Sequence, residues 1–381
     1  MDLEKVRAAM AAYKPQAPEI TATWGPLNNQ LARHRSDIAE LLRSLDGAPA
    51  IPSSWERLAQ LQHELGSTTS EVLALVQGGP LRDREPEGGI YALADALIGE
   101  VATDLGRPWA GITLPGEREM VTPRSSIIHL TFPQVSVWDL PIVLHEYGHA
   151  VASEIHDDLG SPFQRLYNAA DSAVESAHLA ELFADAFASY ACGPAFACTL
   201  VVLRFDPTEQ EATRDLPTHP SHDRRVALVL RVLEEQGREI DDAAWTELVE
   251  ELREAWRSTL RVARPAIADA VPAAAAADGV GNSVSQLLSI LELVPAVSYR
   301  SWERTKRLAS QLTVPPPDGS VSLEEGVTLR DGLNAAWLAR LRSPKEGSEI
   351  GRRAERLMRS IANRRLRGGT APGGGHGGGV F

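Results

Sequence analysis

The sequence predicts a mostly α-helical protein with a small β-sheet, that is, an α+β fold. Apolar residues recur at helical spacing through most of the 381 residues, as at Leu58, Leu61 and Leu65. Two short runs, residues 110–114 and 125–132, are β-like, and the second is rich in Ile and Thr before it ends at Pro133. Since 43% of the residues are hydrophobic, the chain can bury a substantial core.

The composition argues against several classes of protein. A formal net charge of -13 disfavours general nucleic-acid binding, because a duplex partner requires a positive field. Cys192 and Cys198 lack C-x-x-C spacing, so they indicate neither a disulfide framework nor a cysteine metal site, and a reducing cytoplasm fits best. Residues 1–14 carry charges throughout and have no apolar secretory segment. Residues 186–203 are uncharged, but Gly193 and Pro194 interrupt them, which predicts two buried helices without membrane insertion.

The N-terminal part of the chain is expected to be helical. Ile38, Leu41 and Leu45 recur at helical spacing, and breaks rich in Pro or Gly fall at residues 15–18, 47–49 and 78–80. This pattern favours a helical hairpin or a small bundle. A further helix is expected at about residues 90–105, ahead of the two β-like runs.

An apolar run at residues 140–155 contains His145-Glu146-Tyr147-Gly148-His149, the pattern H-E-x-x-H. Residues four apart project from one face of a helix, so both imidazoles can reach one metal ion. Glu146 lies one step round the helix, where it can act as a base toward water instead of as a ligand. This is the zincin signature, and it indicates hydrolysis assisted by one Zn²⁺ per chain.

Two histidines with this spacing also arise by chance on exposed helices. Here the neighbouring residues are apolar, so the helix is expected to be buried, and buried polar side chains need partners. The apolar neighbours are Ile142, Val143, Leu144, Ala150 and Val151. A metal site is therefore favoured over an accidental match.

A catalytic zinc site needs a third protein ligand, with the fourth position left to water. Ile155 stands where metzincins have their third histidine, and His156 is one residue late, so that class is disfavoured. A long helix expected at residues 163–190 offers other candidates with spacings that place them near one face. These residues are Glu175, His178, Glu181 and Asp185.

Three elements, in this order, resemble the gluzincin family that contains the CAAX prenyl endopeptidases and the HtpX-type quality-control proteases. They are H-E-x-x-H at residues 145–149, E-x-x-x-D at residues 181–185, and T-H-P-x-x-x-x-R at residues 218–225. The resemblance covers about residues 140–230. The segment from Glu181 also resembles soluble ImmA-type peptidases. Two departures from the membrane members are the lack of convincing transmembrane helices and the short interval between His149 and Glu181.

The resemblance implies a role for each of these residues. Glu181 would be the third zinc ligand, although Glu175 or His178 remain alternatives, and Asp185 would accept a hydrogen bond from the other ring nitrogen of His145. His219 would stabilise the oxyanion, and Arg225 would brace the acidic residues. Zincins also place a strand before the metal helix, whose edge can pair with an extended peptide. The candidate edge is Ser126, Ile127, Ile128, His129, Leu130 and Thr131, although an ordinary core strand explains this run equally well.

The expected organisation has five parts. A helical region at residues 1–86 precedes a zincin-like catalytic domain at 87–240, a helical region packed on it at 241–313, and a C-terminal helical region at 314–367. Residues 368–381 form a glycine-rich tail that is expected to be disordered. The last helix is rich in arginine and is expected to be solvated or docked on the chain's own acids. The apolar end Val380-Phe381 suggests that the tail could enter the chain's own cleft.

Together these patterns predict a soluble zinc metallopeptidase that acts on a protein or peptide, as an endopeptidase in preference to an exopeptidase, with Glu146 as general base. Two alternatives remain. One is a non-catalytic helical interaction or regulatory protein that retains the fold, against which the intact Glu146 argues because a scaffold does not need it. The other is a zinc hydrolase of small amides or esters.

Overall fold

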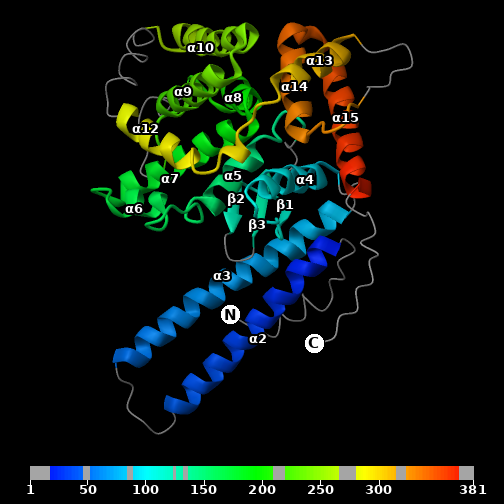
Figure 1. The fold of residues 1–381 in the computed structure, drawn as a ribbon. Helices are drawn as coiled ribbons and strands as arrows, with labels where there is room; N and C mark the ends of the chain where they lie inside the picture. Colours follow the sequence, from blue (N-terminus) through cyan, green and yellow to red (C-terminus); the bar gives the residue numbers. More distant parts are fainter. Residues whose placement is uncertain are drawn as a thin grey trace, which may run out of the picture.

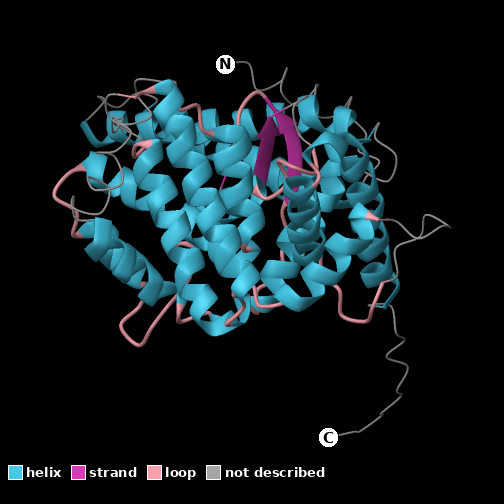
Figure 2. Ribbon diagram, turned by 90° about the horizontal axis from the view of Figure 1, so that it is seen from above, coloured by secondary structure: helices cyan, strands magenta, loops and turns pink. Residues whose placement is uncertain are grey.

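The computed structural model describes residues 18–45, 52–83, 89–122, 126–131, 136–208, 219–265, 280–314 and 323–368. This part of the chain is mostly helical and contains a three-stranded sheet, which confirms the predicted fold class. A long helical hairpin lies on one side of the sheet, and the other helices lie on the opposite side (Figure 1). Figure 2 shows how small the sheet is beside the helices.

The hairpin consists of α2 (Pro18–Leu45) and α3 (Pro52–Asp83). Its apolar side chains meet one face of the sheet in a separate hydrophobic cluster. The members of this cluster are Leu27, Leu31, Leu65, Val72, Leu75, Ile112, Leu114 and Ile127. Buried Arg82 joins the hairpin to the rest of the chain, because it donates to the Thr113 carbonyl at 2.7 Å and pairs with Asp95 at 2.7 Å.

The sheet is formed by β1 (Ile112–Gly116), β2 (Met120–Thr122) and β3 (Ile127–Thr131), in the order β1-β3-β2. β3 pairs in parallel with β1, while its residues 127–129 pair antiparallel with β2. The expectation that Ser126–Thr131 form the free edge is therefore wrong. β3 is central and β2 is the edge beside the helices that follow.

The two faces of β3 have different neighbours. Ile128 and Leu130 belong to the main apolar cluster on the side of the metal-motif helix, whereas Ile127 belongs to the hairpin cluster. Since side chains alternate along a strand, His129 shares the face of Ile127 and points away from that helix. Most of the residues expected to bind substrate are thus core residues of the central strand.

The motif helix α5 (Ile142–Val151) packs closely against α7 (Ala173–Cys192) and also contacts α4 (Gly89–Asp104), while α9 (His222–Ile240) packs against α7. A Cβ added at Gly148 would lie 3.0 Å from the Cα of Ala184, so glycine permits this close approach. The single helix expected at residues 163–190 is divided in two. α6 (Pro162–Asn168) ends first, and α7 begins where the Ser172 side chain accepts the Glu175 N–H at 3.1 Å.

The uncharged run at residues 186–203 also divides, as expected. Gly193 has φ 75°, a value that favours glycine, and it separates α7 from α8 (Pro194–Thr199) and the π-helical turn η2 (Leu200–Arg204). Within the described ranges, no helix combines the length and apolar character that a membrane crossing requires.

The remaining helices complete the main core. They are α10 (Ala243–Ala263), α12 (Val280–Leu291), η4 (Pro295–Val297), α13 (Trp302–Thr313), α14 (Leu329–Arg342), η5 (Pro344–Glu346) and α15 (Gly347–Gly368). One apolar cluster runs from α4 through to α15, so these helices, apart from the fully surface-lying η5, share a core with the metal-motif helix.

Ionic contacts fix the C-terminal helices on this core. Buried Arg330 donates to Glu100 at 2.8 Å and also pairs with Asp104, and Arg365 of the arginine-rich helix α15 lies 3.1 Å from the same Glu100. Arg353 donates to the Leu312 carbonyl at 2.8 Å. The arginine-rich helix is thus docked in part on the chain's own acids. Apart from Gly368, the glycine-rich tail lies outside the described residues.

Candidate metal centre

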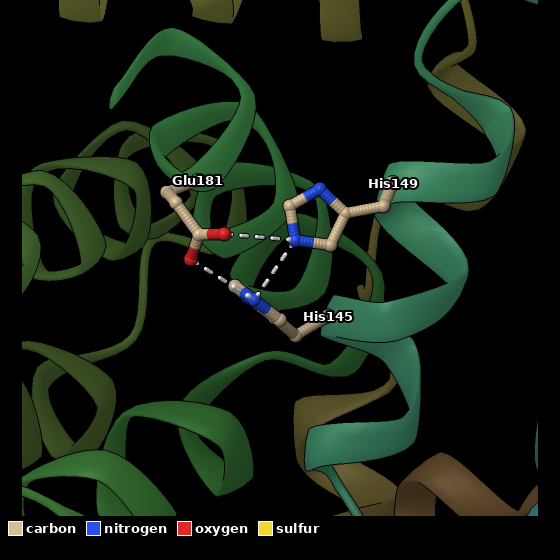
Figure 3. A group of neighbouring side chains, drawn as sticks. All are labelled: His145, His149 and Glu181. Atoms are coloured by element: carbon tan, nitrogen blue, oxygen red, sulfur yellow. Dashed lines mark hydrogen bonds and ion pairs between the residues drawn. The ribbon is translucent and has the colours of Figure 1, made fainter. Parts of the chain in front are cut away.

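Three side chains from α5 and α7 converge on one point (Figure 3). The Nε2 atoms of His145 and His149 are 3.2 Å apart. The Glu181 carboxylate lies 3.5 Å from Nε2 of His145 and 3.4 Å from Nε2 of His149. These residues form a group that could hold a metal ion.

The spacing of these atoms suits zinc. Ligand atoms about 2.0–2.1 Å from a tetrahedral zinc ion are separated from one another by about 3.3–3.4 Å. The observed separations of 3.2, 3.4 and 3.5 Å match this value, and two imidazoles with a carboxylate are a donor set that zinc accepts.

The other two candidate ligands do not join this group. No other cluster of this kind is found in the described part of the chain. Glu175 lies at the start of α7, where its carboxylate accepts the backbone N–H of Asp171 at 2.8 Å, and His178 is a buried residue outside the group.

Asp185 holds His145 in place. Its Oδ1 lies 2.9 Å from Nδ1 of His145, which leaves Nε2 directed at the metal position. Arg225 of α9 binds both oxygens of the same carboxylate, with Nε 2.6 Å from Oδ2 and an Nη nitrogen 2.8 Å from Oδ1. Asp185 is fully buried, so these bonds compensate its charge and fix the ring orientation of His145.

The charges of the group are strongly coupled. Burial opposes protonation of His145, but the hydrogen bond and charge of Asp185, together with the hydrogen bond to Glu181, raise its pKa to about 10. Burial also opposes ionisation of Glu181, yet hydrogen bonds from both histidines lower its pKa below the usual value. A bound divalent cation would replace the proton on His145, since a ligating imidazole is neutral.

Glu146 faces the same pocket but is not part of the ligand group. It is 7% exposed, and within the described residues no hydrogen bond to its carboxylate occurs. Burial raises the pKa of Glu146. The charges of the two histidines lower it, and the negative charges of Glu181 and Glu119 raise it further. A carboxylate whose pKa is raised is better suited to accept and return a proton.

The group opens into a pocket of about 470 Å³. Besides Glu146 and the three residues of the metal group, two further lining residues, His219 and Arg225, were expected from the sequence. Arg225 braces Asp185, and His219 lies 3.8 Å from Glu181 with half of its side chain exposed. His222 also lines the pocket and stacks on Phe205 with ring centroids 4.2 Å apart. Burial, and then the charges of Arg225 and Arg264, lower the pKa of His222 to about 4, so its ring is neutral at pH 7.

The sequence did not reveal the opposite wall of the pocket. That wall comes from β2 and the turn before it, and from η2 and the residue that follows it. The lining residues there are Glu119, Met120, Val121, Leu200, Arg204 and Phe205. None belongs to a motif, and β2 is only three residues long, so no periodic pattern marks it.

No family model, curated protein or solved structure matches this chain. Its function therefore has to be inferred from the geometry of the site.

Glu181→Ala is expected to abolish stoichiometric zinc binding. Two histidines alone leave the ion without its anionic ligand. Losing a residue that only hydrogen-bonds to a metal ligand lowers metal affinity by up to about 100-fold, so losing the ligand itself should lower it further. Metal content after dialysis and competition with a chromogenic chelator measure this effect. Glu175→Ala, on the same helix, is the control and should keep one zinc ion. If the Glu181 variant also kept one, a different third ligand would be required.

Proposed function

We propose that this chain is a zinc-dependent peptidase. The observation that carries this proposal is the carboxylate of Glu146, which is not hydrogen-bonded to the described residues and lies in the same pocket as the convergent His145, His149 and Glu181. A purely structural zinc site is closed by four protein ligands. This group offers three and places a candidate base beside them.

Zinc would be held by Nε2 of His145, Nε2 of His149 and the carboxylate of Glu181. When bound there, it supplies Lewis-acid chemistry, that is, polarisation of a carbonyl group and a lowered pKa of water. Glu146 accepts the proton from the attacking water and returns it to the leaving nitrogen. Its burial keeps the carboxylate poorly solvated, which favours this proton uptake.

Two further residues support the reaction from α9 and the segment before it. His219, half exposed at the mouth of the pocket, can donate a hydrogen bond to the oxyanion that develops on the carbonyl. Arg225 keeps Asp185 ionised and in place, and Asp185 in turn fixes the tautomer of His145.

The edge strand β2 gives the pocket a way to bind an extended peptide. Met120 and Val121 line the pocket, and among the described strands β2 pairs with β3 alone. A peptide can add to such an edge through main-chain hydrogen bonds. Residues 119–122 therefore take the peptide-binding role that was expected for Ser126–Thr131.

The test is a comparison of cleavage products. A mixture of peptides from a digested proteome is incubated with zinc-loaded protein, with chelator-treated protein, and with chelator-treated protein given zinc again, and new termini are identified by mass spectrometry. New termini that require zinc support the proposal. Full zinc occupancy without new termini contradicts it, and hydrolysis of small amides or esters would then indicate the alternative hydrolase.

A further inference from the structure

One end of the metal pocket is bounded by an ionic bridge. Arg204, the last residue of η2, donates to Oε1 of Glu119 at 2.7 Å and lies 3.0 and 2.9 Å from Oδ1 of Asp139. Glu119 immediately precedes the edge strand β2, and Asp139 precedes the motif helix α5. The bridge thus joins the peptide-binding edge to the metal helix near the N-terminal end of α5.

The bridge is not electrically balanced, because one guanidinium serves two carboxylates. Asp139 also accepts a hydrogen bond from Ser136 at 2.7 Å, so both of its oxygens are engaged. Glu119 is engaged through Oε1 alone, which receives Arg204 and the Thr131 hydroxyl at 3.1 Å. In the described residues nothing donates to Oε2. Glu119 lines the pocket and keeps 22% of its side chain exposed.

The two described arginines that line the pocket are already bonded to carboxylates. Arg225 binds both oxygens of Asp185, and Arg204 binds Asp139 as well as Oε1 of Glu119. Asp185 and Asp139 have both oxygens occupied. The half-bonded carboxylate of Glu119, which lines the pocket, is therefore the more accessible partner for a cationic group.

We propose that Glu119 is a specificity-determining residue that binds a cationic nitrogen of the substrate beside the scissile bond. This inference rests on the proposed peptidase function and names the substrate class: peptides that present either a free α-amino group or a basic side chain at this position. An ammonium group can donate to Oε2 of Glu119 without displacing Arg204 from Oε1. A hydrogen bond between charged groups favours the cation by roughly 10- to 100-fold in affinity.

Zinc-anchored probes test this without requiring turnover. The probes are Nα-acetyl-norleucine hydroxamate, which is neutral apart from its anchor, norleucine hydroxamate, which has a free α-amine, and Nα-acetyl-lysine hydroxamate, which has a side-chain cation. Calorimetry gives their affinities for zinc-loaded wild type, for Glu119→Gln and for Glu117→Gln. Glu117 is exposed and lies outside the pocket lining, and Glu117→Gln removes the same charge as Glu119→Gln. The amide introduced by Glu119→Gln keeps an oxygen that can accept from Arg204.

At least one cationic probe should bind wild type roughly 10- to 100-fold more tightly than the neutral probe. Glu119→Gln should remove this advantage, and Glu117→Gln should retain it. The probe that carries the advantage identifies the source of the nitrogen. Equal affinities for all three probes in wild type, or an advantage that persists in Glu119→Gln, would overturn the proposal.

The peptidase function and the role of Glu119 can be refuted separately. A Glu119-dependent preference in a protein that cleaves no peptide would refute the peptidase function and leave the recognition of a cation standing. Cleavage of peptides without the preference would refute only the role of Glu119. A protein that takes up no zinc and binds none of the three probes contradicts both.

Discussion

Glu146→Gln is expected to lower the turnover of a cleaved peptide by about 10²- to 10⁴-fold, the usual contribution of a general acid–base residue. The amide has nearly the shape of the carboxylate but cannot accept the proton from water. Because Glu146 is not a ligand, the variant should still bind one zinc ion through His145, His149 and Glu181. The measurement is kcat and KM on one defined peptide, together with metal content.

A matched substitution separates chemistry from general damage. Glu154→Gln removes a carboxylate that is half exposed, pairs with Arg107 and lies outside the pocket lining, so its kinetics should resemble those of wild type. If the Glu146 variant retained activity within a few-fold of wild type at full zinc occupancy, another group would have to be the base, and the mechanism proposed above would be wrong.

The residues of the metal group could be predicted because their geometry is local. His145, Glu146 and His149 share one helix, and the spacing from Glu181 to Asp185 fixes their relation on another. Only the packing of the two helices against each other is a matter of tertiary structure. It depends on the small residue Gly148, which allows α5 to approach Ala184 closely.

The peptide-binding edge could not be predicted in the same way. Residues 127–131 have the β-branched, apolar pattern of a strand because they are buried on both faces, which is typical of a central strand and not of an edge. The edge β2 has only three residues, Met120–Thr122, too few for an alternating pattern. A strong β signal thus identified the centre of the sheet.

The bridge at the end of the pocket is equally invisible in the sequence. Glu119 and Arg204 are 85 residues apart, and each stands among other charged or apolar residues without a recurring motif. The division between α6 and α7 did have a local signal. Ser172 and Glu175 have the S-x-x-E spacing of a helix start, which the apolar periodicity of the surrounding residues concealed.

Arg225→Met is expected to reduce the free energy of unfolding of the metal-free protein by about 3 kcal/mol, the lower end of the cost of removing one partner from a buried ion pair. The guanidinium binds both oxygens of the fully buried Asp185, and without it His145 is the one partner left among the described residues. Urea denaturation in the presence of a chelator measures the change. Arg231→Met on the same helix, where the side chain is 46% exposed, should cost no more than about 1 kcal/mol.

The loss should depend on pH in a defined direction. Burial opposes ionisation of Asp185, but Arg225 and His145 hold its pKa below the ordinary value. The stability that this carboxylate contributes is therefore present above the unfolded pKa of about 3.9 and is lost only as the pH falls through the lower folded value. In Arg225→Met burial dominates and the pKa rises, so the carboxyl takes up a proton at a higher pH than in wild type.

The difference in stability between wild type and Arg225→Met should accordingly be larger at pH 7.5 than at pH 5. Adding Asp185→Asn to Arg225→Met removes the uncompensated charge, so the double variant should regain part of the lost stability at pH 7.5. A difference that is independent of pH, with no recovery in the double variant, would mean that Arg225 stabilises α9 by packing alone. In that case Arg225 would not stabilise the protein by compensating the charge of Asp185.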